Sequence, residues 1–150
     1  MQNNVQRKGC RSSDHDILVL AQTIYGEARG ELNYMEGGLA ALIAVGNVVV
    51  NRLSKTQSVE SVCKQPLQFS CWNSTDPNLL EIKNATVARP PEFVTCLWVA
   101  EGVLRMNWPD LTNGATHYYS HHMKTPPYWA PKMKIQAKIG HHIFLKEKEH

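Results

Sequence analysis

The chain has 150 residues, a formal net charge of +3 and 43% hydrophobic residues. This length suits one compact domain and is short for two, and the composition excludes a wholly disordered protein. Because the basic residues are dispersed and form no stripe interleaved with aromatic residues, we expect no nucleic-acid partner.

The beginning of the chain is polar. Residues 1–13 predict a flexible tail, followed by one domain over residues 14–150. No apolar core of a signal peptide occurs in residues 1–16, and the longest apolar run, residues 39–50, is interrupted by a Gly-Asn pair. We therefore expect a protein that is made in the cytoplasm without a signal peptide and does not insert into a membrane.

The first predicted helix begins at an acidic cap, Asp14 or Asp16, and has apolar residues at helical spacing as far as Ala28. Gly30 is expected to end it. In projection Glu27 lies about 80° from the centre of the apolar stripe. Its side chain is therefore predicted to sit on the flank of the helix, half facing the core.

Four further elements follow in the middle of the chain. Residues 36–53 are apolar on almost every face, which is typical of a central, buried helix. A short helix is predicted after Ser58. The Asp76-Pro77 pair predicts the cap and first turn of a helix that reaches Ala88. After a pair of prolines, another apolar stripe predicts a helix that reaches Leu104.

The last part of the chain, from Ala115, is rich in Tyr, His and Pro. It predicts loops with short strands near Thr116–Tyr119 and Ile143–Leu145. The expected fold class is therefore α+β and mainly helical, with a central buried helix and a small late β element.

Four cysteines do not match the spacing of a zinc site. Cys96 falls on an apolar helix face and is expected to be a buried thiol. Cys63 and Cys71 flank one loop, where they can either pair or, in a reducing cytoplasm, stay free. Cys10 lies in the predicted tail.

Two carboxylates, Glu27 and Glu31, lie four residues apart where the first helix pattern ends. A carboxyl group at the edge of an apolar surface is partly desolvated, which suits a general acid near neutral pH. A two-carboxylate glycosidase places its groups about 5 to 9 Å apart on opposite sides of the sugar, whereas residues one helical turn apart share one side. At most one of the two is then the acid. Alternatively, both belong to a solvated helix end.

Histidines and aromatic residues are concentrated late in the chain. His117 and His121 have i,i+4 spacing, but the segment is predicted to be extended, so the two rings do not converge as zinc ligands do. We therefore expect no metal. Aromatic residues such as Tyr118 and Trp129 can stack on sugars or belong to the core, and the sequence leaves both interpretations open.

Six segments, in order, resemble the spore-cortex-lytic enzyme family of cell-wall hydrolases. They are Leu20-Ala21-Gln22-Thr23-Ile24-Tyr25-Gly26-Glu27-Ala28-Arg29-Gly30-Glu31, Ala44-Val45-Gly46-Asn47-Val48-Val49-Val50-Asn51-Arg52, Gln68-Phe69-Ser70, Ala115-Thr116-His117-Tyr118, Pro127-Tyr128-Trp129-Ala130 and Ile139-Gly140-His141-His142-Ile143-Phe144. The resemblance spans most of the chain, from about Asp16 to Leu145.

The resemblance implies a lysozyme-like domain that cuts glycan strands of peptidoglycan between N-acetylmuramic acid and N-acetylglucosamine. It implies a lytic transglycosylase that leaves 1,6-anhydromuramic ends, uses Glu27 as its catalytic residue, and needs no cofactor or metal. By motif position, the residues implied to bind substrate are Gln68, Phe69, His117, Tyr118 and Trp129, and those in supporting roles are Glu31, Arg29 and His142.

Three alternatives stay open: a hydrolytic muramidase, a metal-dependent peptidoglycan amidase built on the late histidines, and a wall-binding module without catalysis. The expected partner is the peptidoglycan glycan strand, and the expected state is a monomer. A wall-degrading domain without an export signal further resembles a phage lysis enzyme that reaches the cell wall after release.

Overall fold

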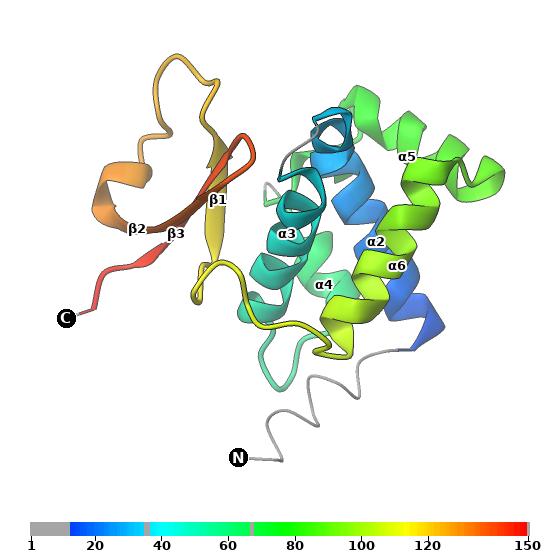
Figure 1. Cartoon of the computed structure of the whole chain (residues 1–150), viewed down its shortest axis with the longest axis horizontal. Coiled ribbons are helices and arrows are strands. Elements are labelled where there is room, and N and C mark those ends of the chain that lie inside the picture. Colours follow the sequence, from blue (N-terminus) through cyan, green and yellow to red (C-terminus); the bar gives the residue numbers. More distant parts are fainter. Residues whose placement is uncertain (1–12, 35–36, 67, 150) are drawn as a thin grey trace.

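The computed structural model describes residues 13–34, 37–66 and 68–149. A group of helices lies beside a small sheet (Figure 1). The helices are α2 (Asp14–Ala28), α3 (Gly38–Arg52), α4 (Val59–Cys63), α5 (Pro77–Ala88) and α6 (Pro91–Leu104), and the 3-10 turns are η1 (Arg29–Asn33), η2 (Ser70–Trp72) and η3 (Ala130–Lys132). Apart from Ser13, the predicted tail lies outside the described residues. No helix among the described residues is long and apolar enough to cross a membrane.

Helix α2 begins and ends differently from the prediction. Its N-cap is Ser13, whose hydroxyl accepts a hydrogen bond from the backbone N–H of Asp16, so the predicted acidic cap is wrong. The α-helix ends at Ala28, where φ is −140°, and the chain continues as the 3-10 turn η1 through Gly30. The direction of the chain therefore changes between Glu27 and Glu31.

Helix α3 confirms the prediction of a buried central helix, because its residues from 41 to 50 are all buried. It lies between the sheet and the other helices (Figure 1). Helix α2 shares the centre, since it contacts α3, α4, α5 and α6. The predicted limits of α5 are confirmed, with Asp76 as the N-cap and Pro77 in the first turn. Helix α6 buries Phe93 and Cys96 on its predicted apolar face.

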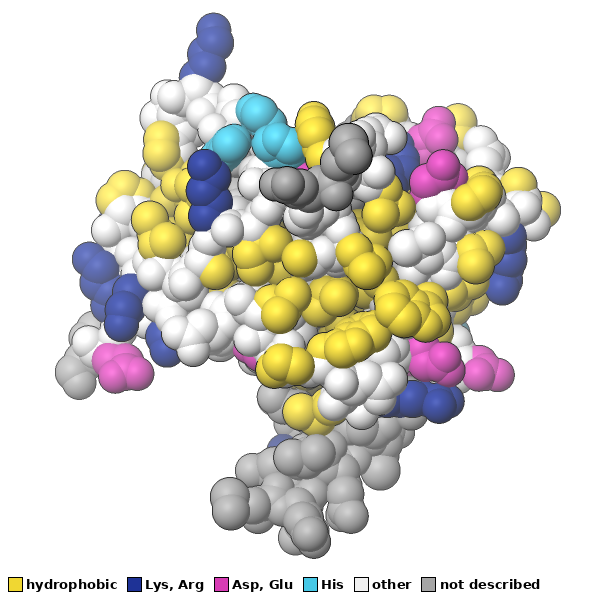
Figure 2. All heavy atoms as spheres, viewed as in Figure 1, with side chains coloured by type: hydrophobic (Ala, Val, Ile, Leu, Met, Phe, Trp, Pro, Cys, Tyr) yellow, Lys and Arg dark blue, Asp and Glu magenta, His cyan; other side chains and the backbone are white. Residues whose placement is uncertain are grey.

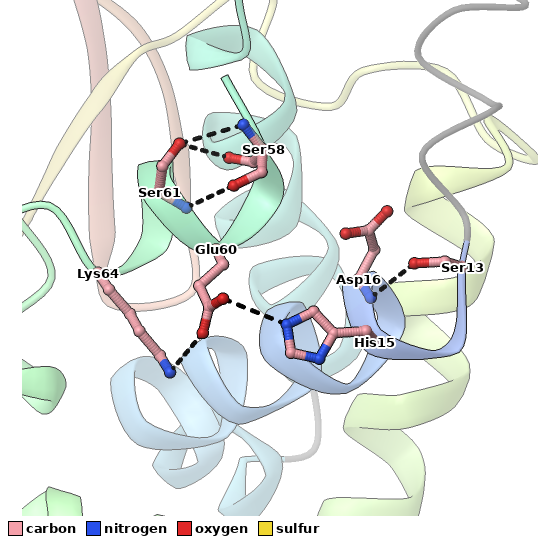
Figure 3. A network of polar contacts seen from close by, with 7 residues as sticks. All are labelled: Ser13, His15, Asp16, Ser58, Glu60, Ser61 and Lys64. Atoms are coloured by element: carbon pink, nitrogen blue, oxygen red, sulfur yellow. Dashed lines mark hydrogen bonds and ion pairs between the residues drawn. The ribbon is translucent and has the colours of Figure 1, made fainter. Parts of the chain in front are cut away.

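The short helix α4 is held by polar contacts at its two ends (Figure 3). Ser58 and Ser61 form a capping box, in which each side chain accepts a hydrogen bond from the backbone N–H of the other. Glu60 contacts His15 of α2 at 3.3 Å and Lys64 at 2.8 Å. A helix of five residues is marginal alone, so the capping box and the burial of Val59, Val62 and Cys63 explain why it forms.

The sheet consists of β1 (His117–Ser120), β2 (Met133–Ile139) and β3 (His142–Glu147), which are antiparallel in the order β1-β3-β2. β1 and β3 confirm the two predicted strands, and Tyr118 pairs with Phe144. The sequence prediction missed β2. This outer strand is half exposed and is interrupted by an irregularity between Ile135 and Ala137, so its polar–apolar alternation is weak.

Candidate active site

Glu27 lies in the last turn of α2, half buried, where three distant segments meet. Its Oε1 accepts a hydrogen bond from the Tyr118 hydroxyl of β1. Its Oε2 accepts a hydrogen bond from the backbone N–H of Cys71 in η2, at 3.2 Å. The predicted position on the helix flank is confirmed. Both oxygens have a donor, so the carboxylate is held in one orientation.

The turn η2 lies directly on α2 because residue 26 has no side chain. A Cβ on Gly26 would lie 2.7 Å from the Cβ of Cys71, closer than any real contact. The indole N–H of Trp72 donates to Thr23 Oγ1 at 2.9 Å and fixes the turn on the helix. The glycine before Glu27 is therefore needed to bring the Cys71 N–H to the carboxylate.

Tyr118 lines the cleft and packs on the core, which confirms the core interpretation, whereas stacking on a sugar stays a prediction. Its ring lies 6.3 Å from that of Phe69 and 5.7 Å from that of Phe144. Burial, and secondly the charge of Glu27, raises the pKa of Tyr118 well above its ordinary value. The phenol therefore keeps its proton and can donate to a carboxylate or accept from a carboxylic acid.

The C-terminal end of α3 fixes the start of β1. Asn51 Nδ2 donates to the carbonyl of Ala115 at 2.9 Å. Arg52 Nε donates to the carbonyl of Thr116 at 2.6 Å, and its Nη1 donates to Gln68 Oε1 at 3.0 Å. Burial lowers the pKa of Arg52. Neither residue of this pair was among the predicted site residues, although the Asn-Arg segment was one of the six recognised segments.

These segments enclose a cleft of about 900 Å³ with Glu27 in its wall. The predicted residues that line it are Gln68, Phe69, His117, Tyr118, Trp129 and His142. Phe69 is only 2% exposed and forms part of the floor. The Trp129 ring lies 5.3 Å from that of His117 and is half exposed. Among the described lining residues, Glu27 is the only carboxylate.

The cleft does not include Arg29 or Glu31 among its described lining residues. Arg29 donates to the carbonyl of Tyr25 at 3.2 Å and lies over its ring, at the end of α2. Glu31 is 5% exposed, so the alternative of a solvated helix end is wrong for it. The expected side-by-side position of Glu27 and Glu31 is also wrong, because α2 ends between them.

Glu31 binds the turn between β2 and β3. Its carboxylate accepts a hydrogen bond from the His141 N–H at 3.0 Å and lies 3.0 Å from His141 Nδ1. It also lies 3.2 Å from His142 Nδ1. This contact is short, but its geometry is not that of a hydrogen bond. At Gly140, where φ is +57°, a Cβ would lie 2.8 Å from Glu31 Oε2. A glycine is thus required for the turn to reach the carboxylate.

His142 connects this turn to the cleft. Its ring meets that of Tyr118 edge to face, with centroids 5.2 Å apart. Burial lowers the pKa of His142, and the neighbouring His141 acts in the same direction. Glu31 therefore holds the turn that places His142 against Tyr118, and its supporting role stays a prediction.

Three of the late histidines, His121, His122 and His141, lie against one another, and Figure 2 shows histidine side chains grouped on one part of the surface. The ring of His122 lies 4.5 Å from that of His121 and 4.6 Å from that of His141. Among the described residues, however, no group of three or more His, Cys, Asp or Glu side chains could hold a metal ion.

The described cysteines are free, so the alternative of a Cys63–Cys71 pair is wrong. The expected burial of Cys96 is confirmed. Burial raises the pKa of Cys63 and of Cys96 to about 12, which keeps both thiols protonated. Cys10 lies outside the described residues.

Replacing Tyr118 by phenylalanine is expected to lower kcat about tenfold to a hundredfold. The variant loses a hydrogen bond to a charged group, worth about 1.5–3 kcal/mol, and keeps the ring that packs on the core. Initial rates of the peptidoglycan cleavage expected from the sequence, together with thermal unfolding, measure the two effects. Tyr25→Phe, the same change outside the cleft, is the control and should keep full activity. An unchanged kcat for Tyr118→Phe would make Tyr118 a packing residue only.

The sequence of residues 37–145 matches the family described as Cell Wall Hydrolase. The spore cortex-lytic enzyme of Halalkalibacterium halodurans is 30% identical over 135 residues, and that of Bacillus subtilis is 33% identical over 136. Each alignment covers 88% of this chain but only 35% and 38% of the respective relative. The chain thus spans little more than a third of these relatives.

Two solved structures share the fold. The catalytic domain of the Bacillus cereus SleB protein superimposes with a TM-score of 0.61 at 22% identity, covering 89% of this chain and 91% of that one. The catalytic domain of the germination-specific lytic transglycosylase SleB from Bacillus anthracis gives a TM-score of 0.56 at 24% identity, with 89% and 96% covered. The predicted lysozyme-like, mainly helical α+β fold is confirmed.

Proposed function

The chain belongs to the cell wall hydrolase family, and from this premise we propose that it cleaves the glycan strands of peptidoglycan as a lytic transglycosylase. The bond cut is the one between N-acetylmuramic acid and N-acetylglucosamine, and the product ends in 1,6-anhydromuramic acid. The proposal has support from the relatives, which are named as spore cortex-lytic enzymes and, for the Bacillus anthracis domain, as a lytic transglycosylase.

The observation that carries the proposal is the single carboxyl group of the cleft. Glu27 is the only carboxylate among the described lining residues, and Glu31 is buried against the β2–β3 turn, where it contacts His141. A mechanism with two opposed carboxylates therefore lacks its second carboxylate among the described residues of the cleft. Intramolecular attack needs only one carboxyl group, which gives a proton and then takes one back.

In the proposed reaction, Glu27 donates its proton to the bridging oxygen as the bond from C1 of N-acetylmuramic acid breaks. The leaving sugar departs with that proton as a hydroxyl. The 6-hydroxyl oxygen of the same muramic acid forms a new bond to C1, and Glu27 accepts the hydroxyl proton. No water is consumed, and the carboxyl group returns to its first state.

The neighbours of Glu27 suit both of its protonation states. The Tyr118 hydroxyl donates to the carboxylate and can turn to accept from the acid. The Cys71 N–H stays a donor to the other oxygen. We propose that Trp129 and His117 hold the sugar rings while Gln68, fixed by Arg52, binds polar groups of the strand.

Mass spectrometry of digested peptidoglycan tests the proposal. Anhydro ends are expected, and activity should survive EDTA. Fragments with ordinary reducing ends, one water heavier per cut, would indicate a hydrolytic muramidase. Freed peptides together with loss of activity in EDTA would indicate the metal-dependent amidase. Binding to peptidoglycan without any soluble fragment would indicate a wall-binding module.

We also propose that the enzyme acts on the wall as a monomer after release from the cytoplasm, as in phage lysis. Expression in a bacterium without a pore-forming partner is expected to leave the cells intact. Lysates of the same cells should clear purified peptidoglycan added from outside, which turbidity measures. Lysis of the host by this chain alone, or its recovery from the medium, would contradict release through a separate pore.

A further inference from the structure

A second opening continues the cleft past Arg52. It has a volume of about 560 Å³ and shares Arg52, Gln68 and His117 with the cleft. We call it the side pocket. Its other lining residues include Gln65 and Lys146. Because three residues belong to both walls, a ligand in the cleft can continue into the side pocket without leaving the protein surface.

The side pocket differs from the cleft in chemistry. Four aromatic side chains besides the floor residue Phe69 line the cleft: Tyr118, Tyr119, Tyr128 and Trp129. Among its described residues, the side pocket has no Phe, Tyr or Trp, and it has charges of both signs from Arg52, Lys146, Glu147 and Glu149. Aromatic surfaces suit sugar rings, whereas a polar wall with mixed charges suits a ligand that itself carries charges.

Lys146 is the cation of the side pocket that has room for a ligand. Arg52 is already hydrogen-bonded to the Thr116 carbonyl and to Gln68. Lys146 forms no ion pair with any described residue, and its ammonium group lies beside Gly114, whose φ is +87°. A Cβ built on Gly114 would lie 4.0 Å from the Lys146 Nζ. The ammonium therefore lies in the wall of the side pocket, next to Gly114.

The place of the side pocket fits the chemistry of the polymer. Peptidoglycan carries short peptides with free carboxylate and amino groups, and each is attached to N-acetylmuramic acid. In the proposed reaction this sugar occupies the position next to the bond cut at Glu27. Its peptide therefore leaves the strand within one sugar of Glu27. Arg52 lies in the wall that the cleft shares with the side pocket. The charge of Glu27 is close enough to act on the pKa of Arg52.

We propose that the side pocket binds the peptide of the muramic acid at the cleavage site, with Lys146 contacting a peptide carboxylate. The inference rests on the proposed function and names its substrate class, glycan strands that still carry their peptides. Strands stripped of peptides are the poorer substrate.

The test compares soluble glycan strands with intact peptides against the same strands after an amidase has removed them. The wild-type protein is expected to have a kcat/KM at least about threefold higher on the peptide-bearing strands, the scale of a partly exposed ion pair. Lys146→Met should bring this ratio close to one, mainly through KM. Lys138→Met, which removes the same charge from an exposed position of β2 outside both openings, should keep the wild-type ratio.

A binding measurement separates recognition from chemistry. Calorimetry with the Glu27→Gln protein and uncut strands should show the same preference in Kd, and adding Lys146→Met should remove it. Equal or better cleavage of stripped strands, or a Lys146→Met protein with the full wild-type preference, overturns the inference even if every product has an anhydro end. If neither substrate yields glycan fragments, the proposed function fails and the inference falls with it.

Discussion

Glu27→Gln is expected to fold normally and to lose about two to four orders of magnitude of cleavage rate, the scale of a general acid–base contribution. Glutamine can keep both hydrogen bonds of the carboxylate. Its oxygen accepts from the Cys71 N–H, and its amide nitrogen can donate to the Tyr118 oxygen. The side chain therefore stays in place, but it has no proton to give to the bridging oxygen.

The measurement is the rate of anhydro-end formation at matched protein concentration, together with the melting temperature. Glu60→Gln, the same substitution at an exposed ion pair on α4 (Figure 3), is the control and should clear peptidoglycan at the normal rate. Near-normal turbidity clearance by Glu27→Gln would remove Glu27 from the mechanism.

Glu31→Ala is expected to lower the free energy of unfolding by about 1–3 kcal/mol, since it leaves the His141 N–H without the buried carboxylate oxygen that accepts its hydrogen bond. The carboxylate is 5% exposed, and His141 would lose the acceptor of its backbone N–H and of its ring. Glu31→Gln keeps the shape and an acceptor oxygen for the His141 N–H, and should therefore cost less than Glu31→Ala. Below the melting temperature, the folded fraction of either variant should retain most of its activity.

Urea unfolding followed by circular dichroism measures this effect. Glu60→Ala removes a carboxylate whose partners are exposed and should change the midpoint little. An inactive but stably folded Glu31 variant, together with an active Glu27 variant, would reverse the roles assigned to the two residues.

Local signals in the sequence were sufficient for most helices. The Asp76-Pro77 pair and the apolar stripe that reaches Leu104 depend on capping and periodicity within one segment, and both predictions were confirmed. At the start of α2, the sequence predicted an acidic residue as the N-cap, but Ser13, just before the first turn, is the cap. Strand β2 was missed because only its pairing with β3 makes its weak pattern a strand.

The site could be predicted only in part, for a related reason. Motif order predicted Glu27 as the central residue, but the segments that complete its surroundings meet only in three dimensions. The Cys71 N–H and Arg52 contribute through backbone position and packing, which no spacing in the sequence reveals. Glu31 is buried because it contacts His141, in a turn more than a hundred positions later. The local sequence pattern, which resembles a solvated helix end, therefore gave a wrong prediction for Glu31.

The order of the strands determines when Glu27 can gain its Tyr118 partner during synthesis of the chain. Within the described sheet, β1 pairs only with β3, the last strand to be made. Glu27 and Tyr118 are 91 positions apart, and the strand that carries Tyr118 has no sheet partner until residues 142–147 have been translated. The Glu27 carboxylate therefore acquires its Tyr118 partner within the folded sheet only after β3 has been synthesised, long after α2 itself can form.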